Sequence, residues 1–477
     1  MGVLVKAKGL LKGQPPYRSR VLGIGCIKRI LKDIKRTPTL FPPYLYAGGC
    51  SGNTVSVTMK ITSIALLFAL SSTAQAAENI NFLAFGDGGY HPDYPKTKHI
   101  KSPKNKAEFI AAEKADWLEE HRPLEEFNHA PIYVYPGTET ATEETGALVV
   151  GQAMASLCEK KPCDFAIQLG DNIYPDGAAA NDGKDDQKRM DDLILGPLKP
   201  LLIQNPELVV YSALGNHDWK TSRRGVKLQT EWMAKQANFH MDGKGYYSYT
   251  FGETGNNVEF FVLDTNMLLS GQHYYEIPLK PDGSEQGLAS ALASGQAEVE
   301  DIEKHEQPVN GEDHRQLAWL ANGLKNSTAK WKIVYGHHVL WSIGGTKYDE
   351  AHVLRRLILP ELCEYADAYI AGHEHDLELL TDDCSRVLPG NTKPNLPLII
   401  SGAASKMRGT HTPLANYQEK RYPEYELVWN KAFTWGFAHI ELDNQKDMLN
   451  VSFYSTPNDL SGQLVPEQSF SFAHRSK

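Results

Sequence analysis

Five short sequence strings, spread over almost three hundred residues, combine glycine with side chains that bind metal ions. They are FGDGG with Asp87, LGDNIY with Asp171 and Tyr174, LGNHD with Asn216 and His217, YGHH with His337, and AGHEH with His373 and His375. Their carboxylate, amide, phenol and imidazole groups all act as metal ligands. Two adjacent metal ions cleave phosphate esters because they stabilise both the attacking and the leaving oxygen. Together the strings predict a two-metal phosphoesterase site.

Each string follows a short apolar run that is typical of a buried strand. Runs of this kind cover 79–85, 164–169, 207–214, 258–264, 331–335, 368–371 and 397–403, and all but 258–264 and 397–403 lead into one of the five strings. Helical spacing of apolar residues at 145–160 and 313–326 favours an α/β fold with largely parallel central strands. Ligands in such sheets gather at the carboxyl ends of the strands. An aspartate there could merely cap the next helix, but five metal-competent sites together favour metal binding.

The C-terminal part has a different pattern, with antiparallel strands predicted at 433–443, at 448–456 and near 468–473. Two mixed sheets packed together, with helices outside, would accommodate both parts. We expect one catalytic domain over 77–477. Two polar segments, 91–144 and 270–312, are interpreted as insertions, because loops of that length are usually functional covers or mobile surface.

The N-terminal part contains an export signal. Residues 59–76 combine Lys60, an apolar core at 61–70 and the small-x-small pattern of Ala74 and Ala76, which predicts a signal peptide cleaved after Ala76. The apolar core is too short to span a bilayer, so no stable membrane anchor is expected. Residues 1–58 hold ten Lys or Arg against one Asp, and we interpret them as an untranslated or non-native extension. A transit peptide or a basic interaction tail is the alternative.

Charge and cysteine content limit the function further. The 401 residues after Ala76 carry 38 basic and 57 acidic side chains, a net charge of −19. Such a protein is a poor candidate for binding nucleic acid through phosphate neutralisation. Four cysteines remain in this part, and we expect disulfides in an exported chain, with Cys158 paired to Cys163 and Cys363 to Cys384. We therefore predict a secreted or periplasmic enzyme.

Several site residues can be given roles from their chemistry. Asp171 is the natural bridging ligand, because a carboxylate reaches two cations, and Asn216 offers a neutral oxygen. His217 is well placed to protonate a departing alkoxide, although it could instead orient a metal-bound water. Spacing alone does not assign roles to His337 and His338. We expect one of them to be a ligand and the other a neighbouring or substrate-contacting group.

Three basic residues follow the third string in HDWKTSRRG. Lys220, Arg223 and Arg224 could contact a second phosphate or an anionic leaving group. A solvated basic loop is the more common outcome for such a run.

The order GDGG, GDNIY, GNHD, GHH…WS and GHEH resembles the metallophosphoesterase superfamily and, within it, the purple acid phosphatases. The resemblance spans residues 80 to about 405 and includes SGAASK at 401–406. Most metallophosphoesterases begin with Asp-x-His; this chain lacks that histidine and has Tyr174 in GDNIY, as purple acid phosphatases do. The resemblance implies an αββα sandwich of two packed mixed sheets flanked by helices.

The resemblance also implies a division of the ligands between two metals. It implies a ferric site of Asp87, Asp171, Tyr174 and His375, and a divalent site of Asp171, Asn216, His337 and His373. The divalent ion could be Fe, Zn or Mn, because ligand type does not choose among them. His217 falls on the family's proton-donating histidine.

We therefore predict an exported acid phosphatase that cleaves small phosphorylated substrates by attack of a metal-bound hydroxide. A phosphodiesterase or nucleotide pyrophosphatase with Zn or Mn at both sites is one alternative. A metalloprotein that binds phosphate without hydrolysing it is another.

Overall fold

The computed structural model describes residues 78–180, 185–270, 272–276, 280, 298–301, 311–345 and 347–475. These belong to one compact unit, Thr73–Lys477. The predicted extension at 1–58 and signal peptide at 59–76 lie outside the described residues, as does most of the segment 270–312.

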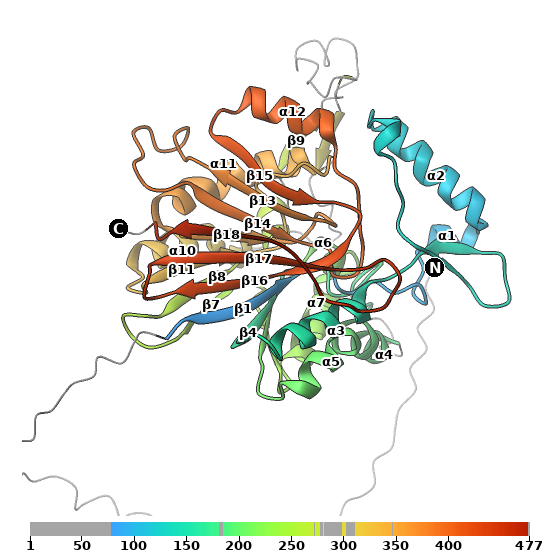
Figure 1. Ribbon diagram of the computed structural model, residues 1–477, viewed down its shortest axis with the longest axis horizontal. Helices are drawn as coiled ribbons and strands as arrows, with labels where there is room; N and C mark the ends of the chain where they lie inside the picture. Colours follow the sequence, from blue (N-terminus) through green and yellow to red (C-terminus); the bar gives the residue numbers. More distant parts are fainter. Residues whose placement is uncertain are drawn as a thin grey trace, which may run out of the picture. The chain divides into compact units, whose positions relative to one another are not determined.

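The first sheet has seven strands among the described residues. Their order is β18 (Val465–Ala473), β17 (Met448–Thr456), β16 (Trp435–Asp443), β1 (Ile80–Phe85), β4 (Phe165–Gln168), β5 (Val210–Ser212) and β6 (Phe239–His240). Strands β1, β4, β5 and β6 are parallel, whereas β16, β17 and β18 add to β1 antiparallel. Strand β1, blue in Figure 1, thus lies beside the red β16 from the other end of the chain.

The second sheet also has seven strands in the described part of the chain. Their order is β15 (Tyr425–Lys431), β13 (Leu377–Asp382), β14 (Leu396–Ser401), β12 (Ala368–Ala371), β11 (Trp331–Tyr335), β8 (Val258–Val262) and β7 (Tyr247–Phe251). The four strands in its centre, β14, β12, β11 and β8, are parallel. Both sheets are therefore mixed, as the sequence predicted.

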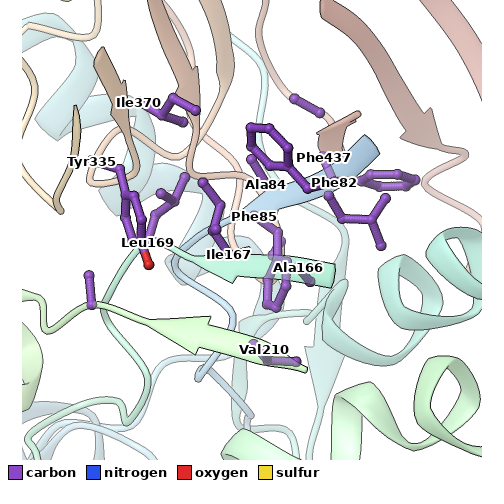
Figure 2. Packing of buried hydrophobic residues seen from close by; sticks show 14 of the residues in the cluster. Phe82, Ala84, Phe85, Ala166, Ile167, Leu169, Val210, Tyr335, Ile370 and Phe437 are labelled. Atoms are coloured by element: carbon purple, nitrogen blue, oxygen red, sulfur yellow. The ribbon is translucent and has the colours of Figure 1, made fainter. Parts of the chain in front are cut away.

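The two sheets pack face to face through large aromatic side chains. Phe82 on β1 and Phe165 on β4 stack at 5.1 Å, and Phe260 on β8 meets them edge-on at 5.2 and 5.4 Å. Figure 2 shows this core, with residues of β1, β4 and β5 facing Tyr335 and Ile370 of the second sheet. Alternation along β8 sends Phe260 into this core, whereas Phe261 packs in a second core with helices.

Helices cover the outer faces of both sheets, which explains why the strands are apolar on both sides. Helices α3 (Ala147–Cys158) and α5 (Gly196–Gln204) share the first core with β16 and β17. Helices α10 (Gly311–Asn326) and α11 (Tyr348–Tyr365) share the second core with β8, β11 and β12. Further helical segments outside the two insertions, among the described residues, are α4 (Asp186–Met190), η2 (Asp191–Leu195), α6 (Asn216–Trp219), α7 (Arg223–Met233), α8 (Thr265–Leu269) and α12 (Thr412–Arg421).

The insertion at 91–144 is structured rather than a simple loop. It contains α1 (Thr97–Lys101), α2 (Lys106–Glu119), η1 (Leu124–Glu126) and the hairpin of β2 (Ile132–Val134) with β3 (Ala141–Glu143). Helix α2 begins with a capping box, in which Asn105 and Glu108 each accept the other's backbone N–H. In the second insertion, β9 (His273–Glu276) pairs antiparallel with β10 (Glu298–Asp301).

Both predicted disulfides are present. Cys158 is bonded to Cys163, with Cα atoms 5.5 Å apart, and Cys363 to Cys384, with Cα atoms 5.7 Å apart. The second bridge ties the end of α11 to the segment after β13. Among the described helices, none has the length and apolar character required to cross a membrane.

Candidate metal centre

The ligand candidates lie in the loops that follow five parallel strands, as predicted. Asp87 follows β1, Asp171 follows β4 and Asn216 follows β5 in the first sheet; His337 follows β11, and His373 and His375 follow β12 in the second. Backbone bonds join the loops within each sheet: the Asp87 N–H donates to the Gly170 carbonyl at 3.0 Å, and the Gly372 N–H to the His337 carbonyl at 3.0 Å. The two sets of loops are joined by the His373 backbone N–H, which donates to Asp87 Oδ2 at 2.8 Å. One site is therefore assembled from both sheets.

Three ligand candidates have left-handed backbone conformations. The φ angles are 58° at Asp87, 53° at Asp171 and 70° at His373. Such conformations are unfavourable for residues other than glycine and concentrate at functional sites. Gly372 allows the close approach of the loops, because a Cβ there would lie 2.7 Å from Asp87 Oδ2.

The Tyr174 hydroxyl stands at the centre of the first group of ligands. It lies 2.6 Å from Asp171 Oδ2, 2.9 Å from Asp87 Oδ1 and 3.1 Å from His375 Nε2. A phenol has one proton and can donate it to only one of the two carboxylates. The described residues Asp87, Asp171 and His375 also place ligand atoms within 4.8 Å of one another, close enough for a single metal ion.

Burial makes this first group unfavourable without a cation. Burial, and then the charge of Asp171, raises the pKa of Asp87 well above its usual range. Burial and the same two carboxylates raise the pKa of Tyr174. Two buried carboxylates next to a phenol fit a hard, highly charged ion, which would offset their repulsion and release the phenol proton.

In the second group of ligand candidates, the unprotonated nitrogens of two histidine rings face each other. His337 Nδ1 lies 2.8 Å from the Leu169 carbonyl, which only accepts hydrogen bonds, so that nitrogen carries the proton and Nε2 has the lone pair. His373 Nε2 faces Glu350 Oε2 at 2.7 Å, so its Nδ1 has the lone pair. These two lone-pair nitrogens lie 3.0 Å apart.

Two oxygens complete this second group. His337 Nε2 is 3.2 Å from Asn216 Oδ1 and 3.4 Å from Asp171 Oδ1. Burial lowers the pKa of His337 to about 3, and burial with Lys347 lowers the pKa of His373 well below its usual range. Neutral imidazoles thus direct lone pairs at an amide and a carboxylate oxygen, an arrangement that fits a bound divalent cation.

His217 lies beside both groups. Its backbone N–H donates to Asp171 Oδ1 at 2.8 Å. Its ring lies 4.1 Å from that of Tyr174, and the ring Nδ1 contacts the Pro175 carbonyl. Lys220 Nζ approaches His217 Nε2 at 2.8 Å. Burial, opposed by Asp171 and reinforced by Lys220, lowers the pKa of His217 to about 4. The ring is therefore protonated only under acidic conditions.

His338 lies beside both His337 and His373, with its ring 5.1 Å from that of His337. Its Nδ1 is 2.8 Å from Thr265 Oγ1, and its ring lies 4.3 Å from that of His373. His338, Glu350 and His373 place ligand atoms within 4.8 Å of one another. The structure thus places His337 next to Asn216 and Asp171, and His338 next to His373 and Glu350.

The remaining basic candidates differ from one another. Lys220 is at the site, whereas Arg223 pairs with Asp313 at 2.8 Å and lies over the Trp219 ring at 5.0 Å. Arg224 is exposed in the first turn of α7. The contacts of Arg223 are those of a structural residue.

Two carboxylates that support the ligands were not singled out from the sequence. Asp218 is fully buried and accepts bonds from the N–H groups of Gly215 at 2.9 Å, Asn172 at 3.0 Å and Ile173 at 3.1 Å, which fixes the GDNIY loop to the GNHD loop. The position of Asp218 inside the GNHD string could have identified it from the sequence. Glu350, at the start of α11, lies outside every string, so only the fold brings it to His373.

Comparison with known proteins agrees with this geometry. Residues 147–377 match the family of calcineurin-like phosphoesterases, Metallophos. The matched segment includes every ligand candidate except Asp87. It is 27% identical over 268 residues to purple acid phosphatase 17 of Arabidopsis thaliana, covering 56% of this chain and 66% of that protein.

The chain is also similar to a second acid phosphatase in sequence and to a solved structure in fold. Over 248 residues the chain is 27% identical to tartrate-resistant acid phosphatase type 5 of Oryctolagus cuniculus, covering 51% of this chain and 64% of the relative. The match thus spans less than two thirds of either curated relative. The solved structure titled "GAP50 the anchor in the inner membrane complex of Plasmodium" shares the fold, with a TM-score of 0.51, 14% identity and coverage of 84% and 90%. The family match and the two acid phosphatases support a binuclear-metal phosphoesterase.

Proposed function

We propose that this protein is an exported phosphomonoesterase of the acid phosphatase type. In it, Asp87, Asp171, Tyr174 and His375 hold a ferric ion, and Asp171, Asn216, His337 and His373 hold a divalent ion of Fe, Zn or Mn. One observation carries the proposal: two neutral imidazole lone pairs lie 3.0 Å apart beside carboxylate and amide oxygens, where only a cation would stabilise them.

The bound metals would supply Lewis acidity and make a nucleophile available at mild pH. Residues of the chain position the proton donor and supply the proton. Asp171 lies in both ligand groups, and its Oδ1 also accepts the His217 N–H, which fixes His217 relative to the centre. From there His217 protonates the leaving oxygen of the substrate, a role worth about 10²- to 10⁴-fold in rate.

The acidic working range follows from His217. A general acid must carry its proton, and burial with Lys220 keeps the pKa of His217 at about 4. The protonated fraction therefore falls as the pH rises above this value. Export is supported by the two disulfides, which persist in oxidising compartments.

The test is hydrolysis by metal-loaded protein, at acidic and neutral pH, of p-nitrophenyl phosphate and of bis(p-nitrophenyl) phosphate. We expect the monoester to be favoured, with the higher activity at acidic pH. Preference for the diester would instead support the phosphodiesterase alternative. If the protein holds two metals but hydrolyses neither ester, the phosphate-binding alternative would be supported. Either result contradicts the proposal.

A further inference from the structure

The segment 95–107, which contains α1, is strongly basic. Its lysines are Lys96, Lys98, Lys101, Lys104 and Lys106. The segment has no Asp or Glu, whereas the chain after Ala76 carries a net charge of −19. All five lysines are exposed, and none forms an ion pair with a carboxylate among the described residues. The positive charge of this basic segment is therefore available to an anionic partner.

The basic segment also exposes a large apolar side chain. Ile100 on α1 is 65% exposed, and α1 has no buried residue. Among the described residues, seven large apolar side chains are exposed, and four of them, including Ile100, belong to the insertion at 91–144. Exposed apolar side chains flanked by lysines are typical of surfaces that bind at the boundary between lipid headgroups and acyl chains.

A cavity of about 630 Å³ is lined by the basic segment, by α2 and by the hairpin of β2 and β3. This volume is within the range of small-molecule sites, about 300–1,000 Å³. The apolar part of the lining includes Ile100, Phe109, Ala112 and Ala141. The lining contains none of the seven ligand candidates, so the cavity is separate from the metal centre.

The charged groups that line the cavity come from different elements. Lys98 and Lys104 belong to the basic segment, as does His99. Glu113 and Asp116 belong to α2. An anionic group is therefore expected at the basic segment, where two lysines and no carboxylate line the cavity.

Backbone bonds attach the basic segment to the hairpin. The Ala141 N–H donates to the Lys104 carbonyl at 2.8 Å. The next residue, Asn105, forms an antiparallel bridge with Thr140 and caps α2. Lys104 is therefore fixed relative to the apolar walls that α2 and the hairpin supply.

We propose that the insertion binds anionic phospholipid at a membrane surface, with an acyl chain in the cavity and the lipid phosphate at Lys98 and Lys104. Ile100 enters the lipid interface beside them, and the other lysines of the basic segment face the anionic headgroups. Each lysine near an anionic surface strengthens binding about fivefold. The site is separate from the metal centre, so this inference does not depend on the proposed function.

The experiment measures sedimentation of the metal-loaded full chain with vesicles of phosphatidylglycerol or of phosphatidylcholine at low salt. We expect binding to the anionic phosphatidylglycerol vesicles and none to phosphatidylcholine. Lys98→Gln with Lys104→Gln should weaken binding about 25-fold. Ile100→Ser should weaken it about tenfold, because the burial of one large apolar side chain is lost. Ala112→Phe keeps all of these side chains but fills part of the cavity, and it should also decrease binding.

Two matched controls change the same kinds of side chain outside the insertion. Lys199→Gln with Lys235→Gln removes two exposed lysines, and Ile203→Ser removes an apolar side chain that is 78% exposed on α5. Both should bind phosphatidylglycerol vesicles as the unaltered chain does. Every variant should hydrolyse p-nitrophenyl phosphate like the unaltered chain, which shows that it is folded.

Several results would overturn the inference. Equal binding to both kinds of vesicle, or equal losses in the control variants, would remove the role of the basic segment. Unchanged binding in Ile100→Ser and Ala112→Phe would reduce the contact to adsorption by charge alone and would contradict an acyl-chain site. The absence of vesicle binding would leave a soluble anionic polymer as the partner of the lysines, and it would contradict the inference as well.

Discussion

The proton positions on two histidines decide what the site can bind. The Leu169 carbonyl and the Glu350 carboxylate each accept a hydrogen bond from one ring nitrogen, of His337 and His373 respectively. The other nitrogens, His337 Nε2 and His373 Nδ1, therefore face each other without protons. Carboxylate partners of this kind fix the orientation of metal-binding histidines and increase their basicity. In the proposed centre, Glu350 would therefore act on the divalent metal through His373.

Replacing Glu350 tests this role. Glu350→Gln keeps the size of the side chain but removes the charge, and we expect the affinity for the divalent ion to fall about tenfold or more. Competition with a chelator measures the affinity without reference to activity. Glu364→Gln is the matched control, because Glu364 lies near the other end of α11 with its side chain 46% exposed. Equal metal affinity in Glu350→Gln and the unaltered chain would contradict the role.

The pH dependence of hydrolysis should depend on Lys220. Its charge lowers the pKa of His217, so Lys220→Gln should raise that pKa and keep His217 protonated to higher pH. The decrease of kcat/KM on the alkaline side should therefore move to higher pH. A series of pH–rate profiles measures this, with the exposed Lys235→Gln as control. If the alkaline limb of the pH–rate profile stays in place or moves to lower pH in Lys220→Gln, His217 is excluded as the proton donor.

At the scale of elements, the strand ends could be predicted and much of what surrounds them could not. Short apolar runs bounded by Gly and Asp predicted β1, β4, β5, β8, β11, β12 and β14, because strands buried on both faces are apolar throughout and too short for a helix. Asp87, Asp171 and His337 could be placed because they directly follow such strands. Glu350 could not, because its approach to His373 depends on how α11 packs against the second sheet. Helix α2 had a local signal, the Asn105 and Glu108 capping box, within a segment interpreted as a loop.

The two disulfides should contribute unequally to stability. Cys363–Cys384 closes a segment with a sequence separation of 21 and Cys158–Cys163 one of only 5. Loop-closure entropy then predicts a loss of about 3 kcal/mol for Cys363→Ala with Cys384→Ala, and about 2 kcal/mol for the other pair. Denaturant unfolding of both double variants measures the difference. A larger loss from the Cys158–Cys163 pair would contradict this explanation.

At the scale of the whole molecule, a two-sheet core positions the site and the first insertion borders it. Seven candidate ligands from Asp87 to His375 come from loops of both sheets, so neither sheet alone could form the centre. The insertion adds Glu143, whose carboxylate pairs with Arg408 beside His375. The core therefore positions the ligand candidates, and the insertion contributes a charged contact next to them.

The central claim is that these seven side chains hold two metal ions. Anomalous diffraction from crystals of the metal-loaded protein tests it most directly. The account predicts two peaks about 3.5–4 Å apart, one on each side of the Asp171 carboxylate. A single peak, or peaks remote from Asp171 and Tyr174, would contradict it.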